Sequence, residues 1–169
     1  MADTELYETD ILAWSEQQAA ALRGLAGRRD LPNALDLFHV VEEIEDLGQG
    51  QLNAVNSFIR LLMAHAIKCW AQPDAASLLH WHAEIGVWQT ELASRLTASM
   101  RNKIDLDREW RRAVRQALLS LKAHGADTAA DTVRLIVDEH CPLSLDDLNA
   151  DPADPASLVE RLRRALPLS

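Results

Sequence analysis

One apolar pattern continues in phase through the middle of this chain, and it constrains the fold more than any other feature. Apolar or small side chains recur at helical spacing, in the order Leu37, Val41, Ile44, Gly48, Leu52, Val55, Ile59, Leu62, Ala66 and Trp70. Because a helix advances about 100° per residue, all of these positions share one face. The pattern predicts a single long helix over about 34–70, straight or kinked at Gly48–Gly50. The alternative is a break at the glycines, with Gly48 as a helix C-cap.

Shorter helices account for most of the remaining sequence. Thr9 is expected to cap a helix that ends near Leu25 and turns one face inward, consisting of Ile11, Trp14, Gln18, Leu22 and Leu25. Ser77 and Asp107 are expected to begin two more helices, and a further one covers about 127–139. Ser144 and Ser157 each precede an acidic residue by three positions, a spacing typical of the capping box at a helix start.

No segment shows the alternating pattern of a β-strand, so the predicted fold class is all-α, a helical bundle around the long central helix. We predict one helical domain over 1–150. The DPADP linker and a terminal helix, over 151–169, are expected to pack on that domain.

Charge and composition exclude several classes of partner. The formal net charge is −9, whereas nucleic acids and anionic membranes attract basic surfaces. The arginines around Glu109 are interpreted as a salt-bridged surface. No apolar run approaches the roughly 18 residues of a membrane span, and MADTELYETD lacks the features of a secretory signal. Cys69 and Cys141 form no disulfide framework, and we expect a cytoplasmic protein without nucleic-acid or membrane partners.

An ordered series of short motifs resembles one known family. The series comprises YETD with Trp14, Gln18 and Leu22-Arg23, then EEIEDLG at 42–48, LLMAHAIK at 61–68, QP at 72–73, Trp81, and CPLSLDDL at 141–148. These segments are similar to the DUF29 family of small helical proteins, found largely in bacteria and cyanobacteria. The resemblance covers about 7–148. It implies a helical fold and no particular activity.

The acidic segment EEIED is a candidate for one half of a metal or acid–base site. On the helical wheel, Glu42, Glu43 and Asp46 point outward, and only Glu45 lies at the edge of the apolar face. Glu43 and His65 are 22 residues apart, roughly 33 Å along a continuous helix. Metal ligands must converge within about 2–2.5 Å of the ion, so these two motifs by themselves do not make a metal site.

His65 lies within the apolar stripe, with Lys68 at its edge. If Pro73-Asp74 is the tip of a helical hairpin, His82 stands level with His65. A His65–His82 pair is the one low-ranking metal candidate, with Glu84 or Asp36 as a third ligand. The favoured interpretation is hydrogen-bonded core histidines, and no cofactor is predicted.

Gln18 is the second polar residue that the pattern places inside. Tyr7, Asp10 and Glu45 are the groups expected to satisfy its amide. The simple interpretation is a polar pair that fixes helix register. The more specific hypothesis is a ligand pocket whose candidate residues are Gln18, Glu45, His65, Lys68, Trp81, Tyr7 and Asp10.

Two classes of function remain open. No nucleophile–base pair and no set of metal ligands has a spacing that would bring its members together in the predicted helices. The favoured hypothesis is therefore a protein-binding or regulatory module. A homodimer is a reasonable partner hypothesis because the long helix is expected to protrude. The alternative is a metal- or small-ligand-dependent enzyme that uses His65, Lys68 and His82 with an acidic partner.

Overall fold

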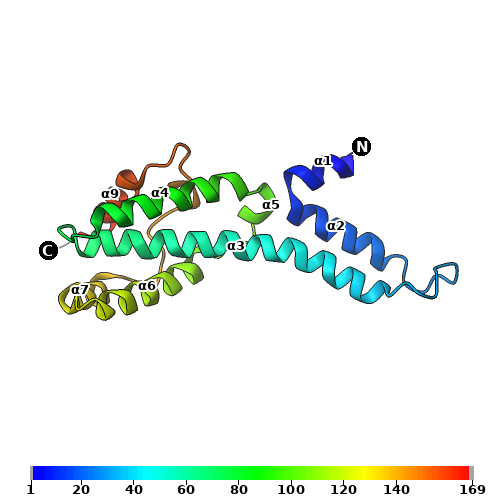
Figure 1. Ribbon diagram of the computed structural model, residues 1–169, viewed down its shortest axis with the longest axis horizontal. Helices are drawn as coiled ribbons and strands as arrows, with labels where there is room; N and C mark the ends of the chain where they lie inside the picture. Colours follow the sequence, from blue (N-terminus) through cyan, green and yellow to red (C-terminus); the bar gives the residue numbers. More distant parts are fainter. Residues whose placement is uncertain (1, 168–169) are drawn as a thin grey trace. The chain divides into compact units, whose positions relative to one another are not determined.

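The computed structural model describes residues 2–167, with side chains from Glu5 onward. The described chain is built from helices and contains no strand (Figure 1). The helices are α1 (Ala2–Thr9), α2 (Ile11–Arg23), α3 (Leu37–Ala71), α4 (Leu78–Arg95), α5 (Ala98–Arg101), α6 (Leu106–Ala123), α7 (Asp127–Ile136), α8 (Leu145–Leu148) and α9 (Pro155–Ala165). The all-α prediction is therefore confirmed.

The predicted long helix is also confirmed, because α3 continues without interruption through Gly48 and Gly50. The contacts between residues divide the described chain into two compact units. The first contains the chain up to Val55 together with Leu96–Lys103, and the second contains Asn56–Arg95 and the chain from Ile104 onward. The prediction of one domain over 1–150 stays a prediction. Among residues 2–167, no helix is both long enough and apolar enough to cross a bilayer.

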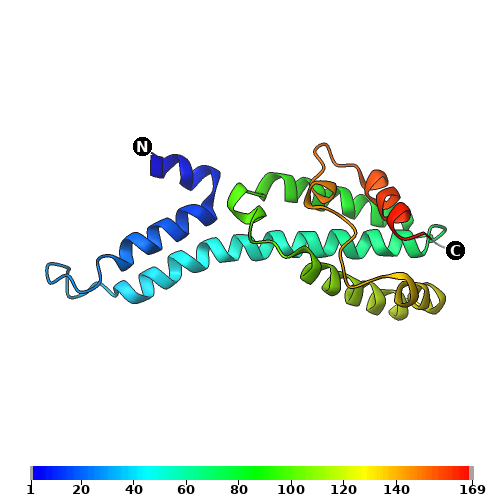
Figure 2. The same ribbon diagram turned by 180° about the vertical axis from the view of Figure 1, so that it is seen from behind.

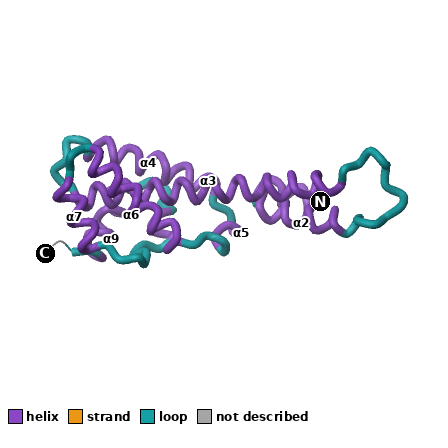
Figure 3. The backbone as a smooth tube through the Cα atoms, turned by 90° about the horizontal axis from the view of Figure 1, so that it is seen from below, coloured by secondary structure: helices purple, strands orange, loops and turns teal. Residues whose placement is uncertain are grey.

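In the first unit, α2 lies alongside the beginning of α3 (Figure 3). Gly48 is the point of close approach, because a Cβ there would be 3.0 Å from Ser15 Cβ and 3.2 Å from Leu12 Cα. The buried face of α2 is Leu12, Ser15 and Ala19, one position along from the predicted stripe. Small side chains allow the helices to approach, so the larger Trp14, Gln18 and Leu22 remain only half-buried.

The start of α2 corrects a second expectation. Thr9 is the last residue of α1, and the cap is Asp10, whose Oδ1 accepts a hydrogen bond from the Ala13 backbone N–H at 3.2 Å. The Asp10 carboxylate also accepts hydrogen bonds from Thr97 Oγ1, Ser99 Oγ and Ser99 N. A single carboxylate thus caps α2 and joins it to the first turn of α5.

In the second unit, the end of α3 is the central element, with α4, α6 and α9 around it (Figure 2). Every residue from Leu62 to Trp70 is buried. The Trp70 indole N–H donates to the Leu166 carbonyl at 2.8 Å, which fixes the end of α9. The α8 capping box at Ser144 and Asp147 is present as predicted. The terminal helix instead begins at Pro155 with Asp154 as its cap, so Ser157 is not its N-cap.

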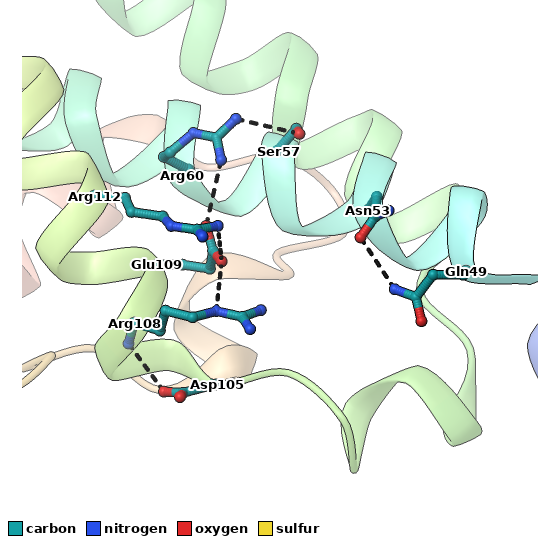
Figure 4. Close-up of polar contacts among 8 residues, drawn as sticks. All are labelled: Gln49, Asn53, Ser57, Arg60, Asp105, Arg108, Glu109 and Arg112. Carbon is teal, nitrogen blue, oxygen red and sulfur yellow. Dashed lines mark hydrogen bonds and ion pairs between the residues drawn. The ribbon is translucent and has the colours of Figure 1, made fainter. Parts of the chain in front are cut away.

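The arginine-rich helix α6 contains a carboxylate that is fully buried. Arg108 Nε and Arg112 Nη1 each donate to Glu109 Oε1 at 3.1 Å (Figure 4). Arg60 of α3 approaches Glu109 Oε2 at 3.5 Å. The predicted salt bridges are therefore present, but Glu109 has 0% exposure and belongs to the interior rather than to the surface.

Candidate functional site

A pocket in the second unit gathers several of the residues that the sequence singled out. It encloses about 480 Å³ beside the turn between α3 and α4. The end of α3, the turn that follows it, the start of α4, and the end of α6 with the residues after it supply the lining. The lining consists of Lys68, Gln72, Ala75, Ala76, Ser77, His80, Trp81, Glu84, Ser120, His124 and Ala126. We call this cavity the Lys68 pocket.

Lys68 is the most unusual residue of the lining. Its side chain is only 6% exposed, and its Nζ lies 4.8 Å from the centre of the Trp81 ring. Among the described residues, no carboxylate is within ion-pairing distance of this ammonium. Burial lowers the pKa of Lys68, and the more distant charge of Glu84 only partly opposes that effect.

A second group of the site links His65 to α4. His65 Nε2 is 2.9 Å from Glu84 Oε2, and His80 Nε2 is 3.5 Å from the same oxygen. The other His65 nitrogen, Nδ1, is 3.0 Å from the Leu61 carbonyl oxygen. Each ring nitrogen of His65 therefore faces an oxygen, one from a carboxylate and one from the backbone.

The surroundings of His65 oppose its full protonation. Burial lowers the pKa of His65, and the positive charge of Lys68 lowers it further. The Trp88 ring packs edge-on against the imidazole, with ring centres 4.6 Å apart. His65 and Glu84 therefore form a close, half-buried pair beside the Lys68 pocket.

The start of α4 adds positive potential to the same pocket. Ala76 and Ser77 precede this helix of 18 residues and line the cavity. A helix N-terminus directs free backbone N–H groups outward and is equivalent to roughly half a positive charge. With Lys68 and His124 also in the lining, the arrangement favours a small anion.

The structure separates the seven predicted pocket residues into two groups. Lys68 and Trp81 line the pocket, and His65 contacts it through Glu84. Tyr7, Asp10, Gln18 and Glu45 belong to the first unit and are not part of this lining. There Tyr7 packs edge-on against Trp14, and Glu45 forms an ion pair with Arg23. The expected outward residues Glu42, Glu43 and Asp46 are exposed.

The structure does not show the low-ranking His65–His82 pair. His65 contacts Glu84, and His82 is a half-buried residue two positions earlier in α4. In the part of the chain that the structure describes, no three His, Cys, Asp or Glu residues are grouped closely enough to hold a metal ion. His80 and His124 had no place in the predicted site. The i, i+4 spacing of His80 and Glu84 is the sequence signal that would have placed His80 there.

A second cavity, in the first unit, is an open groove of about 630 Å³ between the end of α2 and the start of α3. We call it the hairpin groove. Leu31, Leu35, Leu37, Phe38 and Val41 supply its apolar surface. Phe38 is 68% exposed, an unusual amount for a phenylalanine, and it stands beside the acidic residues of α3.

The fold and the Lys68 pocket define an all-helical protein whose central helix supplies a buried lysine to a polar cavity. The family model described as "Domain of unknown function DUF29" matches residues 6–151. The chain belongs to the DUF29 family, which confirms the resemblance seen in its motifs.

One solved structure supports the same fold. It is described as the crystal structure of an alpha-helical protein of unknown function from Rhodospirillum rubrum, and it is 34% identical to this chain. The similarity covers 92% of this chain and 96% of that chain, with a TM-score of 0.82. No curated protein sequence matches the chain significantly.

Proposed function

We propose that this protein is a regulatory module that binds a small anionic ligand, such as a carboxylate or a phosphate, in the Lys68 pocket. One observation carries the proposal: a buried ammonium faces a cavity without an acidic partner at ion-pairing distance. A buried charge that lacks a partner destabilises the folded state. An anion in the cavity removes that cost, so the pocket gains affinity for anions without any rearrangement.

The remaining lining fits the same ligand class. The one carboxylate of the lining, Glu84, is directed at His65 and His80, with its Oε2 2.9 Å and 3.5 Å from their Nε2 atoms. The Trp81 ring supplies a flat apolar wall for the carbon skeleton of the ligand. The start of α4 supplies donors for a second oxygen. The volume of about 480 Å³ falls within the range of small-molecule sites.

Titration of the protein with inorganic phosphate and with succinate, followed by calorimetry, tests the proposal. We expect saturable binding that Lys68→Met weakens by about tenfold or more, since a hydrogen bond to a charged group contributes about 1.5–3 kcal/mol. The matched control is Lys122→Met, because Lys122 is exposed on α6. Equal affinities for Lys68→Met and Lys122→Met would overturn the assignment.

A second candidate function is protein binding at the hairpin groove. Its exposed apolar surface resembles the grooves that accept one face of an amphipathic helix. Glu42 and Glu45 line its α3 side, whereas Arg23, which is paired with Glu45, and Arg28 line its α2 side. The charges of the lining are thus balanced, and the net charge of −9 of the whole chain is what favours a basic partner. We infer that its occupant is a basic amphipathic helix of another protein. A second copy of this chain fits less well, because each copy has a net charge of −9.

A helical peptide of leucine and lysine tests this second function against its leucine–glutamate counterpart. Phe38→Ser is expected to weaken binding of the lysine peptide by about tenfold, a typical effect of losing a central aromatic anchor. Leu135→Ser is the matched control, because Leu135 is 86% exposed and lies in the other unit. Equal binding of the two peptides, or equal effects of the two substitutions, would contradict the inference. Sedimentation that shows a dimer abolished by Phe38→Ser would assign the groove to a second copy instead.

A further inference from the structure

Lysine is rare in this chain, and its one buried position is the one in the pocket. Lys68, Lys103 and Lys122 are the three lysines, against fourteen arginines. Lys103 and Lys122 are exposed, and Lys103 forms an ion pair with Glu16. An arginine cannot lose its proton in a protein, whereas a buried lysine can, and the neutral amine is a nucleophile. The pocket therefore contains the type of cation that can also form a covalent bond.

The neighbours of Lys68 supply what such a reaction needs. Glu84 lines the same pocket and shares its Oε2 with His65 and His80, so a proton donor and acceptor lies beside the amine. The absence of an ion-paired carboxylate among the described residues leaves the amine free to react. Burial against Trp81 excludes water from one side.

We propose that Lys68 forms an imine with a small aldehyde or ketone that also carries a carboxylate or phosphate group. This inference rests on the proposed function, because the anionic group would occupy the positive region at the start of α4. The carbonyl carbon would then lie in the same cavity as the Lys68 amine.

The reaction is balanced without any further reagent. The neutral Lys68 amine attacks the carbonyl carbon. Its nitrogen releases one proton and the carbonyl oxygen takes one up, which gives a carbinolamine. The C–O bond then breaks with protonation of the leaving oxygen, and water departs. Loss of the remaining N–H proton leaves the C=N bond. Glu84 lines the pocket and His65 lies 2.9 Å from its Oε2, so these two groups are placed to donate and recover the protons.

Reductive trapping on the intact protein tests the inference. The protein is incubated with glyoxylate and then with cyanoborohydride, and the labelled lysines are identified by peptide mass mapping. We expect Lys68 to be labelled at least about tenfold faster than Lys103 or Lys122, the advantage expected of an activated amine with a nearby acid–base group. Propanal, which has no anionic group, should show no such preference, and inorganic phosphate should suppress labelling of Lys68.

Two separate readouts distinguish this inference from the proposed function: labelling reports the imine, and calorimetric titration with phosphate reports anion binding. Lys68→Arg cannot form an imine, so labelling at position 68 should disappear in this variant. Labelling of Lys68 at the same rate as the two exposed lysines would overturn the imine and leave anion binding standing. Failure of the wild-type protein to bind phosphate would overturn anion binding. A preference for propanal equal to that for glyoxylate would remove the anionic group from the substrate class.

Discussion

Replacement of Glu109 by glutamine is expected to lower the free energy of unfolding by about 3 kcal/mol. This value is typical of removing one partner of a buried ion pair. The Glu109 carboxylate is fully buried and accepts hydrogen bonds from Arg108 and Arg112, with Arg60 of α3 close by. Glutamine preserves the volume but removes the charge, and its amide nitrogen faces guanidinium donors. Chemical denaturation followed by circular dichroism measures the change.

The matched control is Arg108→Ala, on the same network. Arg108 is nearly half exposed, and an ion pair that water can reach contributes about 0–1 kcal/mol. We therefore expect the two substitutions to differ by about 2 kcal/mol or more. If both cost the same, Glu109 is no more than one member of a surface network, and its burial has no energetic consequence.

Replacement of Asp10 by alanine is expected to cost about 2–3 kcal/mol, through loss of the α2 cap and of buried hydrogen bonds. The Asp10 carboxylate is 9% exposed and accepts from Ala13 N, Thr97 Oγ1 and the backbone and side chain of Ser99. Alanine leaves these donors without their acceptor. Asp30→Ala is the control, because Asp30 is exposed and contacts only Arg28 among the contacts described.

Asp10 is also expected to make the stability of the protein depend on pH. Burial raises the pKa of Asp10, but the hydrogen bonds from Ser99, Ala13 and Thr97 outweigh it and lower the pKa below 3.8. A lowered carboxyl pKa stabilises the folded state above the unfolded pKa, and this stabilisation is lost as the pH falls through the folded value. The stability difference between the wild type and Asp10→Ala should therefore shrink below pH 3.8. A difference that is constant down to pH 2 would show that the carboxylate charge is not involved.

The sequence predicted the central helix well because one signal, the apolar period, extends over its whole length. The stripe from Val41 to Trp70 is buried where the wheel placed it, with Ile44 as a half-buried exception. The inward position of Gly48 was part of that prediction, and Ser15 and Leu12 provide the close contact that explains it. The predicted buried face of α2 was wrong by one position. The prediction chose Trp14 because it is the more hydrophobic residue, whereas close packing against Gly48 requires the small Ser15.

The candidate site was predicted only in part, because some of its residues are brought together by contacts between helices that are distant in the sequence. His65, Lys68 and Trp81 could be selected because each is a polar or amphipathic group at the edge of an apolar stripe. Ser120 of α6 and His124, the residue that follows this helix, line the Lys68 pocket, and nothing in their local sequence pattern indicates it. Glu109 was assigned to the surface because four arginines surround it in sequence, yet Arg60 contacts it from 49 residues away.

The amino-acid sequence by itself determined the helical class, the length of α3, the family and the candidate status of Lys68, since each depends on local periodicity or on the order of short motifs. The tertiary structure decided which polar groups share a pocket, which carboxylate is buried and where the helices approach each other. These outcomes depend on contacts between residues far apart in the chain. No pattern within one helix specifies which face of another helix will meet it.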